Sequence, residues 1–154
     1  MTAARLLPLF VLTALVLGAT SVAAQPSRSA SPQVAIAASD GPSATDVRGG
    51  GEDRNAVPGS GCSGFINNGQ PTATVTFGGE GSLSIYAKSS DDTTILVASP
   101  DGKWHCSDDA NGSNPGVTIA NAGEGTYVVW IGTFSPDSAG SPAQLFAHSG
   151  SPQW

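Results

Sequence analysis

Residues 91–115 read DDTTILVASPDGKWHCSDDANGSNP, and this stretch decides the fold. An apolar, strand-like run at 93–98 enters a Pro-Asp-Gly turn at 100–102, and a short segment at 103–106 leads out of it. The loop that follows is rich in Asp and Asn. Strand pattern, tight-turn chemistry and oxygen-bearing side chains therefore occur together here, which predicts a strand–turn–strand unit followed by a polar loop.

Composition supports an all-β chain. Charged residues make up only 12% of the 154 residues, and there are 20 glycines and 11 prolines, which is typical of strands and turns. The net charge is -6, and the whole excess of acidic over basic residues lies from residue 62 onward. Without a basic patch to neutralise phosphates, we expect no nucleic-acid or anionic-membrane partner. The acidic surface favours solubility, and it can attract cations or basic partners.

The first 61 residues predict two segments ahead of the folded domain. Residues 1–24 form a signal-peptide pattern: Arg5, an apolar run at 6–17, and small residues before Gln25. The run is short for a membrane span, so an uncleaved anchor is the lesser alternative. We expect export to the periplasm or the medium, with no stable membrane insertion after cleavage. Residues 25–61, rich in Ser, Ala, Pro and Gly, predict a disordered linker, with a spacer as the functional alternative.

The pattern changes at residue 62. Segments 72–77, 82–87 and 143–148 alternate apolar and polar residues, 93–98 and 117–120 read as further strands, and 126–132 is apolar on both faces and so central. Glycine-rich turns separate these segments. Many short strands without a helical period predict a jelly-roll-like β-sandwich over 62–149, with 150–154 as a C-terminal tail.

Cys62 and Cys106 are the only cysteines. In an exported chain they predict one disulfide, whereas two free thiols are the less favoured alternative. The closed loop of about 45 residues corresponds to roughly 4 kcal/mol of stabilisation in the chain-entropy treatment.

Four side chains after Cys106 offer oxygen ligands: Asp108, Asp109, Asn111 and Asn114. Calcium takes six to eight oxygens, and such loops can supply them. The spacing does not match an EF-hand, so spacing alone favours ordinary turn and capping chemistry.

Two other kinds of site have less support in the sequence. His105 and His148 are the only histidines, but the chain lacks a GxSxG nucleophile elbow, which argues against a hydrolase. Trp104, Trp130 and Tyr127 could form a sugar-stacking platform, although such aromatics more often pack in the core or at the edge of a small sandwich.

A set of features between residues 62 and 148 occurs together: Asp92-Thr93-Thr94, Pro100-Asp101-Gly102, Trp104, Cys106, Asp108-Asp109, Asn114-Pro115 and the run 125–132. In these features the chain resembles the bacterial pre-peptidase C-terminal domain. It resembles more closely the short exported proteins that carry this domain with little else.

The resemblance implies a calcium-capable, jelly-roll-like module that follows secreted peptidase domains and is not itself catalytic. No peptidase domain precedes the module here, so a role in protease maturation is not expected. Asp92 and Asp101 are expected to join Asp108 and Asp109 if the turn at 100–102 folds the two strands back on each other.

The resulting hypothesis is a non-enzymatic exported module with a calcium-stabilised acidic loop, contacting a protein or a surface polymer. The alternatives are a carbohydrate-binding module that uses Trp104 or Trp130, and a small hydrolase that uses His105.

Overall fold

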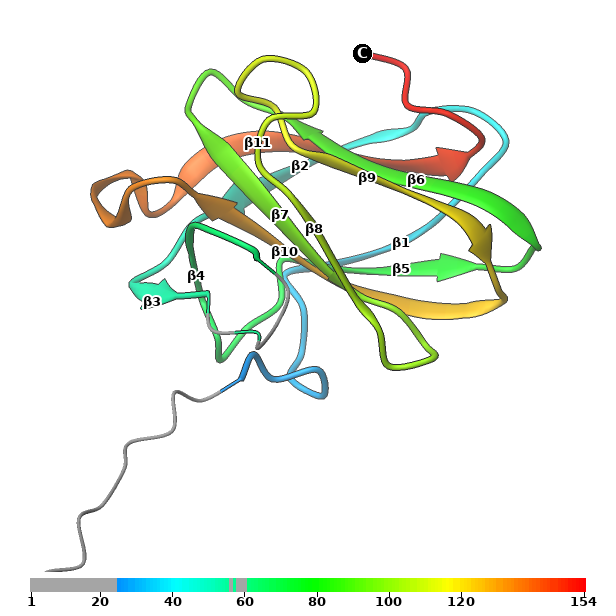
Figure 1. Ribbon diagram of the computed structural model, residues 1–154, viewed down its shortest axis with the longest axis horizontal. Helices are drawn as coiled ribbons and strands as arrows, with labels where there is room; N and C mark the ends of the chain where they lie inside the picture. Colours follow the sequence, from blue (N-terminus) through cyan, green and yellow to red (C-terminus); the bar gives the residue numbers. More distant parts are fainter. Residues whose placement is uncertain (1–24, 56, 58–60) are drawn as a thin grey trace, which may run out of the picture.

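The computed structural model describes residues 25–55, 57 and 61–154, and these form two β-sheets packed face to face (Figure 1). The predicted signal peptide lies outside the described residues. The elements are β1 (Val34–Ala37), β2 (Ala44–Gly49), β3 (Asp53–Arg54), β4 (Phe65–Ile66), β5 (Ala73–Phe77), β6 (Gly81–Lys88), β7 (Thr93–Ala98), β8 (Trp104–Ser107), β9 (Gly116–Ala122), β10 (Gly125–Thr133), the 3-10 turn η1 (Pro136–Ser138) and β11 (Ser141–Ser149).

One sheet has seven strands and the other has four. The larger sheet runs β1-β5-β10-β4-β3, with β7 paired to β10 and β8 paired to β7. The smaller sheet runs β2-β11-β6-β9. Within the named strands, β1 and β5 pair in parallel and the other pairs are antiparallel. The prediction of an all-β sandwich is confirmed, and each strand predicted beyond residue 62 is present.

The core fills the space between the sheets. In β5, Ala73, Val75 and Phe77 point inward, as their alternation predicts. β10 is central because it pairs with β5 and β7, and most of its length is buried on both faces. Each large aliphatic side chain buried in this way contributes about 1.5–3 kcal/mol.

The prediction of a disordered linker at 25–61 is wrong for much of this segment, because β1, β2 and β3 lie within it. β1 extends the larger sheet along β5, and β2 pairs with β11 from Ala44 to Gly49. Val47 is only 7% exposed and joins the main core. The segment has few apolar residues, but it docks onto strand edges that already exist, so it needs little burial of its own.

The C-terminal residues cover part of the outer face of the smaller sheet. The Tyr86 hydroxyl donates a hydrogen bond to the Gln153 carbonyl over 3.0 Å. The rings of Tyr86 and Trp154 meet edge to face with centroids 4.7 Å apart. Tyr86 also stacks on Phe146, with ring centroids 4.9 Å apart. The tail is thus packed against the sheet.

No helix within the described ranges has the length and apolar character that a membrane span requires.

Candidate functional site

The β7–β8 hairpin positions the predicted loop. Ser99 N donates to Lys103 O over 2.9 Å, and Gly102 N donates to Ser99 O over 3.0 Å, which closes the turn. The register pairs Ala98 with Trp104 at the turn and Ile95 with Ser107 at the far end. The residue before β7 therefore lies beside the loop that follows β8.

Three carboxylates meet at that far end. Asp92, Asp108 and Asp109 each offer an oxygen, and these oxygens lie within 4.8 Å of one another. Asp92 and Asp109 are exposed, and Asp108 is partly buried. Burial, followed by the charges of Asp108 and Asp109, raises the pKa of Asp92 above its usual value. We call these three residues the acidic cluster.

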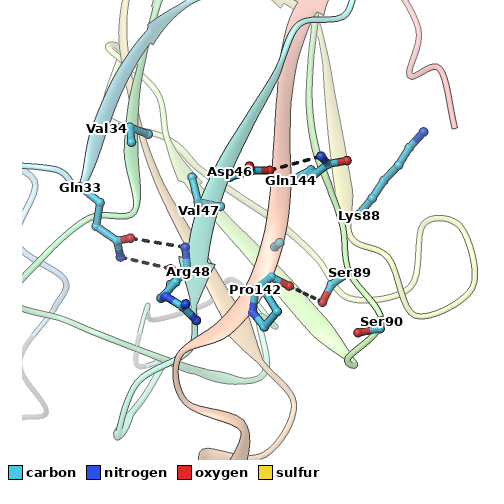
Figure 2. A pocket seen from close by; sticks show the side chains of 11 residues that line it. Gln33, Val34, Asp46, Val47, Arg48, Lys88, Ser89, Ser90, Pro142 and Gln144 are labelled. Atoms are coloured by element: carbon cyan, nitrogen blue, oxygen red, sulfur yellow. Dashed lines mark hydrogen bonds between the residues drawn. The ribbon is translucent and has the colours of Figure 1, made fainter.

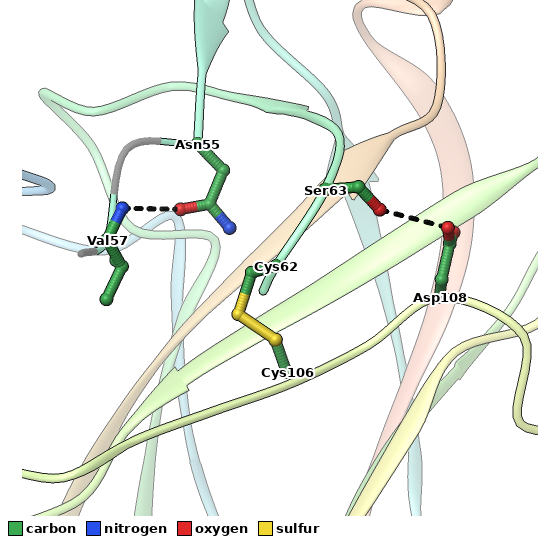
Figure 3. Close-up of a disulfide and its surroundings, with 6 residues drawn as sticks. All are labelled: Asn55, Val57, Cys62, Ser63, Cys106 and Asp108. Atoms are coloured by element: carbon green, nitrogen blue, oxygen red, sulfur yellow. Dashed lines mark hydrogen bonds between the residues drawn. A yellow bond between two sulfur atoms is a disulfide. The ribbon is translucent and has the colours of Figure 1, made fainter. Parts of the chain in front are cut away.

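Asp108 is the most constrained member of the acidic cluster. Its Oδ2 accepts a hydrogen bond from Ser63 Oγ over 3.0 Å (Figure 3). Its Oδ1 is shielded from solvent and has no hydrogen-bond partner among the described residues. One carboxylate oxygen is therefore held by Ser63, while the other is left available to a cation.

The structure separates Asp101 from the acidic cluster, which corrects the expected ligand set. Asp101 lies at the turn end of the hairpin, where Lys103 Nζ contacts its Oδ2 at 2.7 Å and Ser99 Oγ donates to its Oδ1 over 2.6 Å. The hydrogen bond from Lys103 is the largest cause that lowers the pKa of Asp101. An antiparallel hairpin places the residue before its first strand opposite the end of its second strand, so Asp92 and Asp101 cannot meet.

The two asparagines shape the loop. Asn114 Oδ1 accepts from Ser89 N over 2.8 Å, so this oxygen ties the loop to the end of β6. Asn111 and Asn114 face each other in an isolated antiparallel bridge. Neither belongs to the acidic cluster, and their contacts here are those of turn formation.

The predicted disulfide between Cys62 and Cys106 is present, with Cα atoms 5.7 Å apart (Figure 3). It ties the segment before β4 to β8. Gly64 follows closely with a φ of +96°, and a Cβ there would lie 2.5 Å from Thr94 Oγ1. Only glycine suits this conformation and spacing, so the segment that carries Ser63 lies directly against β7.

The aromatic platform is not formed, because Trp130 and Tyr127 are each only 1% exposed. Trp130 packs beneath Trp104, with ring centroids 5.7 Å apart. Trp104 is covered in turn by the Arg28 guanidinium, 4.8 Å from its ring centroid. Trp130 therefore presents no face to a sugar, and it belongs to a second apolar cluster beside the disulfide.

The two histidines lie in different sheets. His105 Nε2 is 3.2 Å from Ser99 Oγ, and Ser99 Oγ donates to Asp101. In a serine triad the carboxylate orients the imidazole, whereas here it contacts the serine. Burial lowers the pKa of His105. His148 is fully buried, with its Nδ1 2.8 Å from the Ser149 carbonyl.

Sequence reasoning missed two features. One is Ser63, a common residue in a segment that was assigned to the start of the domain. The other is an open groove of about 850 Å³ over the smaller sheet (Figure 2). Part of the groove is formed by β2, in which exposed and more buried residues alternate. This alternation could have predicted a strand, but the segment was assigned to a disordered linker.

The fold and the cross-link together define a disulfide-bonded, all-β sandwich domain. No family model matches the sequence, and no curated protein matches it.

Proposed function

We propose that the chain is a non-enzymatic, exported binding or accessory module of the pre-peptidase C-terminal type, whose acidic cluster binds calcium. The observation that carries the calcium assignment is the convergence of Asp92, Asp108 and Asp109 within 4.8 Å. The partner is a protein or a surface polymer.

Electrostatics support the choice of a divalent cation. Three carboxylates at this separation repel one another, and the raised pKa of Asp92 reflects that repulsion in part. A cation converts the repulsion into attraction. The donors are all carboxylate oxygens, which suit calcium better than softer metals. Backbone carbonyls and water would complete the six to eight ligands that calcium takes.

Bound calcium would act on the loop. Asp92 precedes β7 and the other two ligands follow β8, so one ion would join the two strands at the open end of the hairpin. The disulfide and the Ser63 hydrogen bond already order one side of the cluster. This lowers the entropy cost of forming the metal site and favours a stiffened loop as the contact surface.

The non-enzymatic reading is supported by the surroundings of His105. Its neighbour Ser99 donates its hydroxyl hydrogen bond to Asp101, whereas in a catalytic triad the carboxylate contacts the imidazole. Ser99 is also only 7% exposed. We expect no hydrolysis of peptide or ester substrates by the purified chain. An activity that copurifies with the folded protein and is lost in His105→Ala would contradict this part.

Calorimetry and thermal unfolding with calcium test the proposal. Calcium at 100 times its dissociation constant should stabilise the fold by about 2.7 kcal/mol, because it binds only the folded state. Asp108→Asn and Asp109→Asn should remove most of this gain. Asp108→Asn keeps an oxygen for Ser63, so it tests charge rather than the hydrogen bond.

Asp137→Asn is the matched control, because it removes one exposed carboxylate in η1, outside the acidic cluster. It should leave the calcium effect unchanged. An absence of binding heat at millimolar calcium, together with an unchanged unfolding temperature, would refute the metal assignment.

A further inference from the structure

Outward-facing polar side chains from neighbouring strands form part of the lining of the groove over the smaller sheet, and apolar residues form the rest. Asp46 on β2 pairs with Gln144 on β11, which pairs with Lys88 at the end of β6, so the three form one transverse row. Arg48 stands one outward position along β2. Figure 2 shows Arg48 and Lys88 toward opposite ends of the lining, with Asp46 and Gln144 between them.

The described part of the chain has five cationic side chains, and two of them, Arg48 and Lys88, line this groove. Of the other three, Arg28 lies over Trp104, Arg54 lies over Phe65, and Lys103 contacts Asp101. Within the described residues, Arg48 and Lys88 form no ion pair. In a chain of net charge -6, this groove thus holds two cations against one carboxylate, Asp46.

Hydrogen bonds and a ring contact hold these groups, and two of the partners, Gly140 and Phe146, lie outside the groove lining. The Gln33 amide brackets the Arg48 backbone, donating to its carbonyl over 3.1 Å and accepting from its N–H over 3.4 Å. Arg48 Nη1 donates to the Gly140 carbonyl over 3.0 Å, which leaves its other N–H groups available. Lys88 Nζ lies 5.0 Å from the centroid of the Phe146 ring. Both cations are therefore anchored without being neutralised.

An acceptor lies between the two cations. Asp46 Oδ1 accepts from Gln144 Nε2 over 3.2 Å, which orients the carboxylate and leaves Oδ2 without a contact from that amide. A ligand that fits this row needs acidic groups for Arg48 and Lys88 and hydrogen-bond donors for Asp46. The strands of Arg48 and Lys88 are two spacings apart, about 10 Å across the sheet, so the ligand must be extended.

We infer that this groove binds an acidic polysaccharide built from uronic acids. Each uronate unit carries a carboxylate, which matches Arg48 or Lys88, and hydroxyl groups, which can donate to Asp46. A neutral glycan would leave both cations unmatched, and a purely carboxylate polymer would bring no donor to Asp46. The inference rests on the proposed function only in treating the chain as a binding module, because the groove shares no residue with the acidic cluster.

Calorimetry of the full chain with polygalacturonate tests this inference. EDTA is present throughout, so calcium at the acidic cluster plays no part. Two matched probes are polygalacturonate methyl ester, which keeps the hydroxyls and loses the charge, and polyacrylate, which keeps carboxylates and has neither hydroxyl nor N–H donors. We expect polygalacturonate to bind at least roughly tenfold more tightly than either, because charged hydrogen bonds contribute most.

Variants assign the binding to the groove. Arg48→Gln and Lys88→Gln should each weaken polygalacturonate binding roughly tenfold. Lys103→Gln removes the same charge from the turn of the other sheet, so it should bind as the unmodified chain does. Lys88→Gln decides the matter if Arg48→Gln fails to fold. Asp108→Asn should bind polygalacturonate normally, so failure of the calcium site can be told apart from failure of the groove.

Three results would overturn the inference: no binding of polygalacturonate, equal binding of polyacrylate, or equal loss in Lys103→Gln. Equal binding of polyacrylate would mean non-specific attraction of polyanions. Tight binding of the methyl ester alone would point to a neutral glycan and would equally reject the uronate assignment.

Discussion

Ser63 Oγ donates a hydrogen bond to Asp108 Oδ2 over 3.0 Å, next to the disulfide that joins Cys62 to Cys106. Each of the two residues is within two positions of a bonded cysteine. The cross-link therefore holds the donor and the acceptor of this hydrogen bond at a fixed separation. One of the three carboxylates of the acidic cluster is thereby oriented by a covalent constraint that lies outside the cluster.

Breaking the disulfide should therefore affect stability and cation binding together. In the double variant Cys62→Ser, Cys106→Ser, the free energy of unfolding should fall by roughly 4 kcal/mol, since a loop of about 45 residues is no longer closed. The calcium affinity should fall as well, because Asp108 loses its ordered neighbour. Urea unfolding and calorimetry measure the two effects.

Ser63→Ala separates these two effects. It leaves the disulfide in place and removes one exposed hydrogen bond, so stability should change by about 1 kcal/mol or less. Weaker calcium binding with nearly unchanged stability is expected. A calcium affinity equal to that of the unmodified chain would show that Ser63 has no part in orienting Asp108.

The pH dependence of stability should reveal the crowding at Asp92. Its folded-state pKa is raised, by burial first and then by Asp108 and Asp109. The associated stability is thus present below the ordinary value of 3.8 and is lost as pH rises through the raised value. In EDTA at pH 7, Asp92→Asn should unfold at a higher temperature, because the variant removes one of three carboxylates that repel one another. The increase should be only about 1–2 °C, because solvent screens these exposed charges.

Calcium should reverse the sign of the Asp92→Asn effect, since the variant lacks one ligand. Melting curves of both proteins, with EDTA and with calcium, measure this. A destabilising effect of Asp92→Asn in EDTA at pH 7 would contradict the repulsion argument.

Trp130 should be structural. Trp130→Ala should cost about 3–5 kcal/mol of unfolding free energy, because the ring is 1% exposed beside the disulfide. Trp104→Ala, at the partly buried ring above it, should cost about 1–2 kcal/mol. Denaturant unfolding of the two variants tests this ranking. Equal, small losses would mean that Trp130 is less well packed than its burial indicates.

The C-terminal tail should contribute to stability through its aromatic ring. Trp154→Ala removes the edge-to-face contact with Tyr86 and should cost about 1–2 kcal/mol. Gln153→Ala is the control, because Gln153 meets the Tyr86 hydroxyl through its backbone. It should unfold like the unmodified chain. Loss of stability in Gln153→Ala alone would reverse the assignment.

Periodicity predicted the strands beyond residue 62 because their alternation is strong and glycines separate them. The cysteine pair likewise predicted the cross-link, since only one pairing is available. β1 and β2 were missed because composition over 25–61 averages a few apolar residues with many small ones. Their stability comes from the edges of β5 and β11, which are distant in sequence.

The candidate site was predicted in part. Asp92, Asp108 and Asp109 come together as expected, whereas Asp101 does not join them. The predicted strand–turn–strand unit already implied that Asp101, at the turn, lies at the opposite end of the hairpin from Asp92, so Asp101 could have been excluded. Trp130 could have been excluded from a surface platform earlier. It lies in a run that is apolar on both faces, and such a strand is covered on both sides.

The pairing of β2 with β11 also has a kinetic consequence. The hydrogen bond between Gln144 and Asp46 joins residues 98 positions apart, and the Arg48 guanidinium reaches across 92 positions to the Gly140 carbonyl. The smaller sheet can therefore be completed only after most of the chain has been synthesised. Search over such long separations places folding in the millisecond-to-second range typical of β-sandwiches. During that interval the edge of β11 is open to pairing with other chains, so dilute refolding should give higher yields than concentrated refolding.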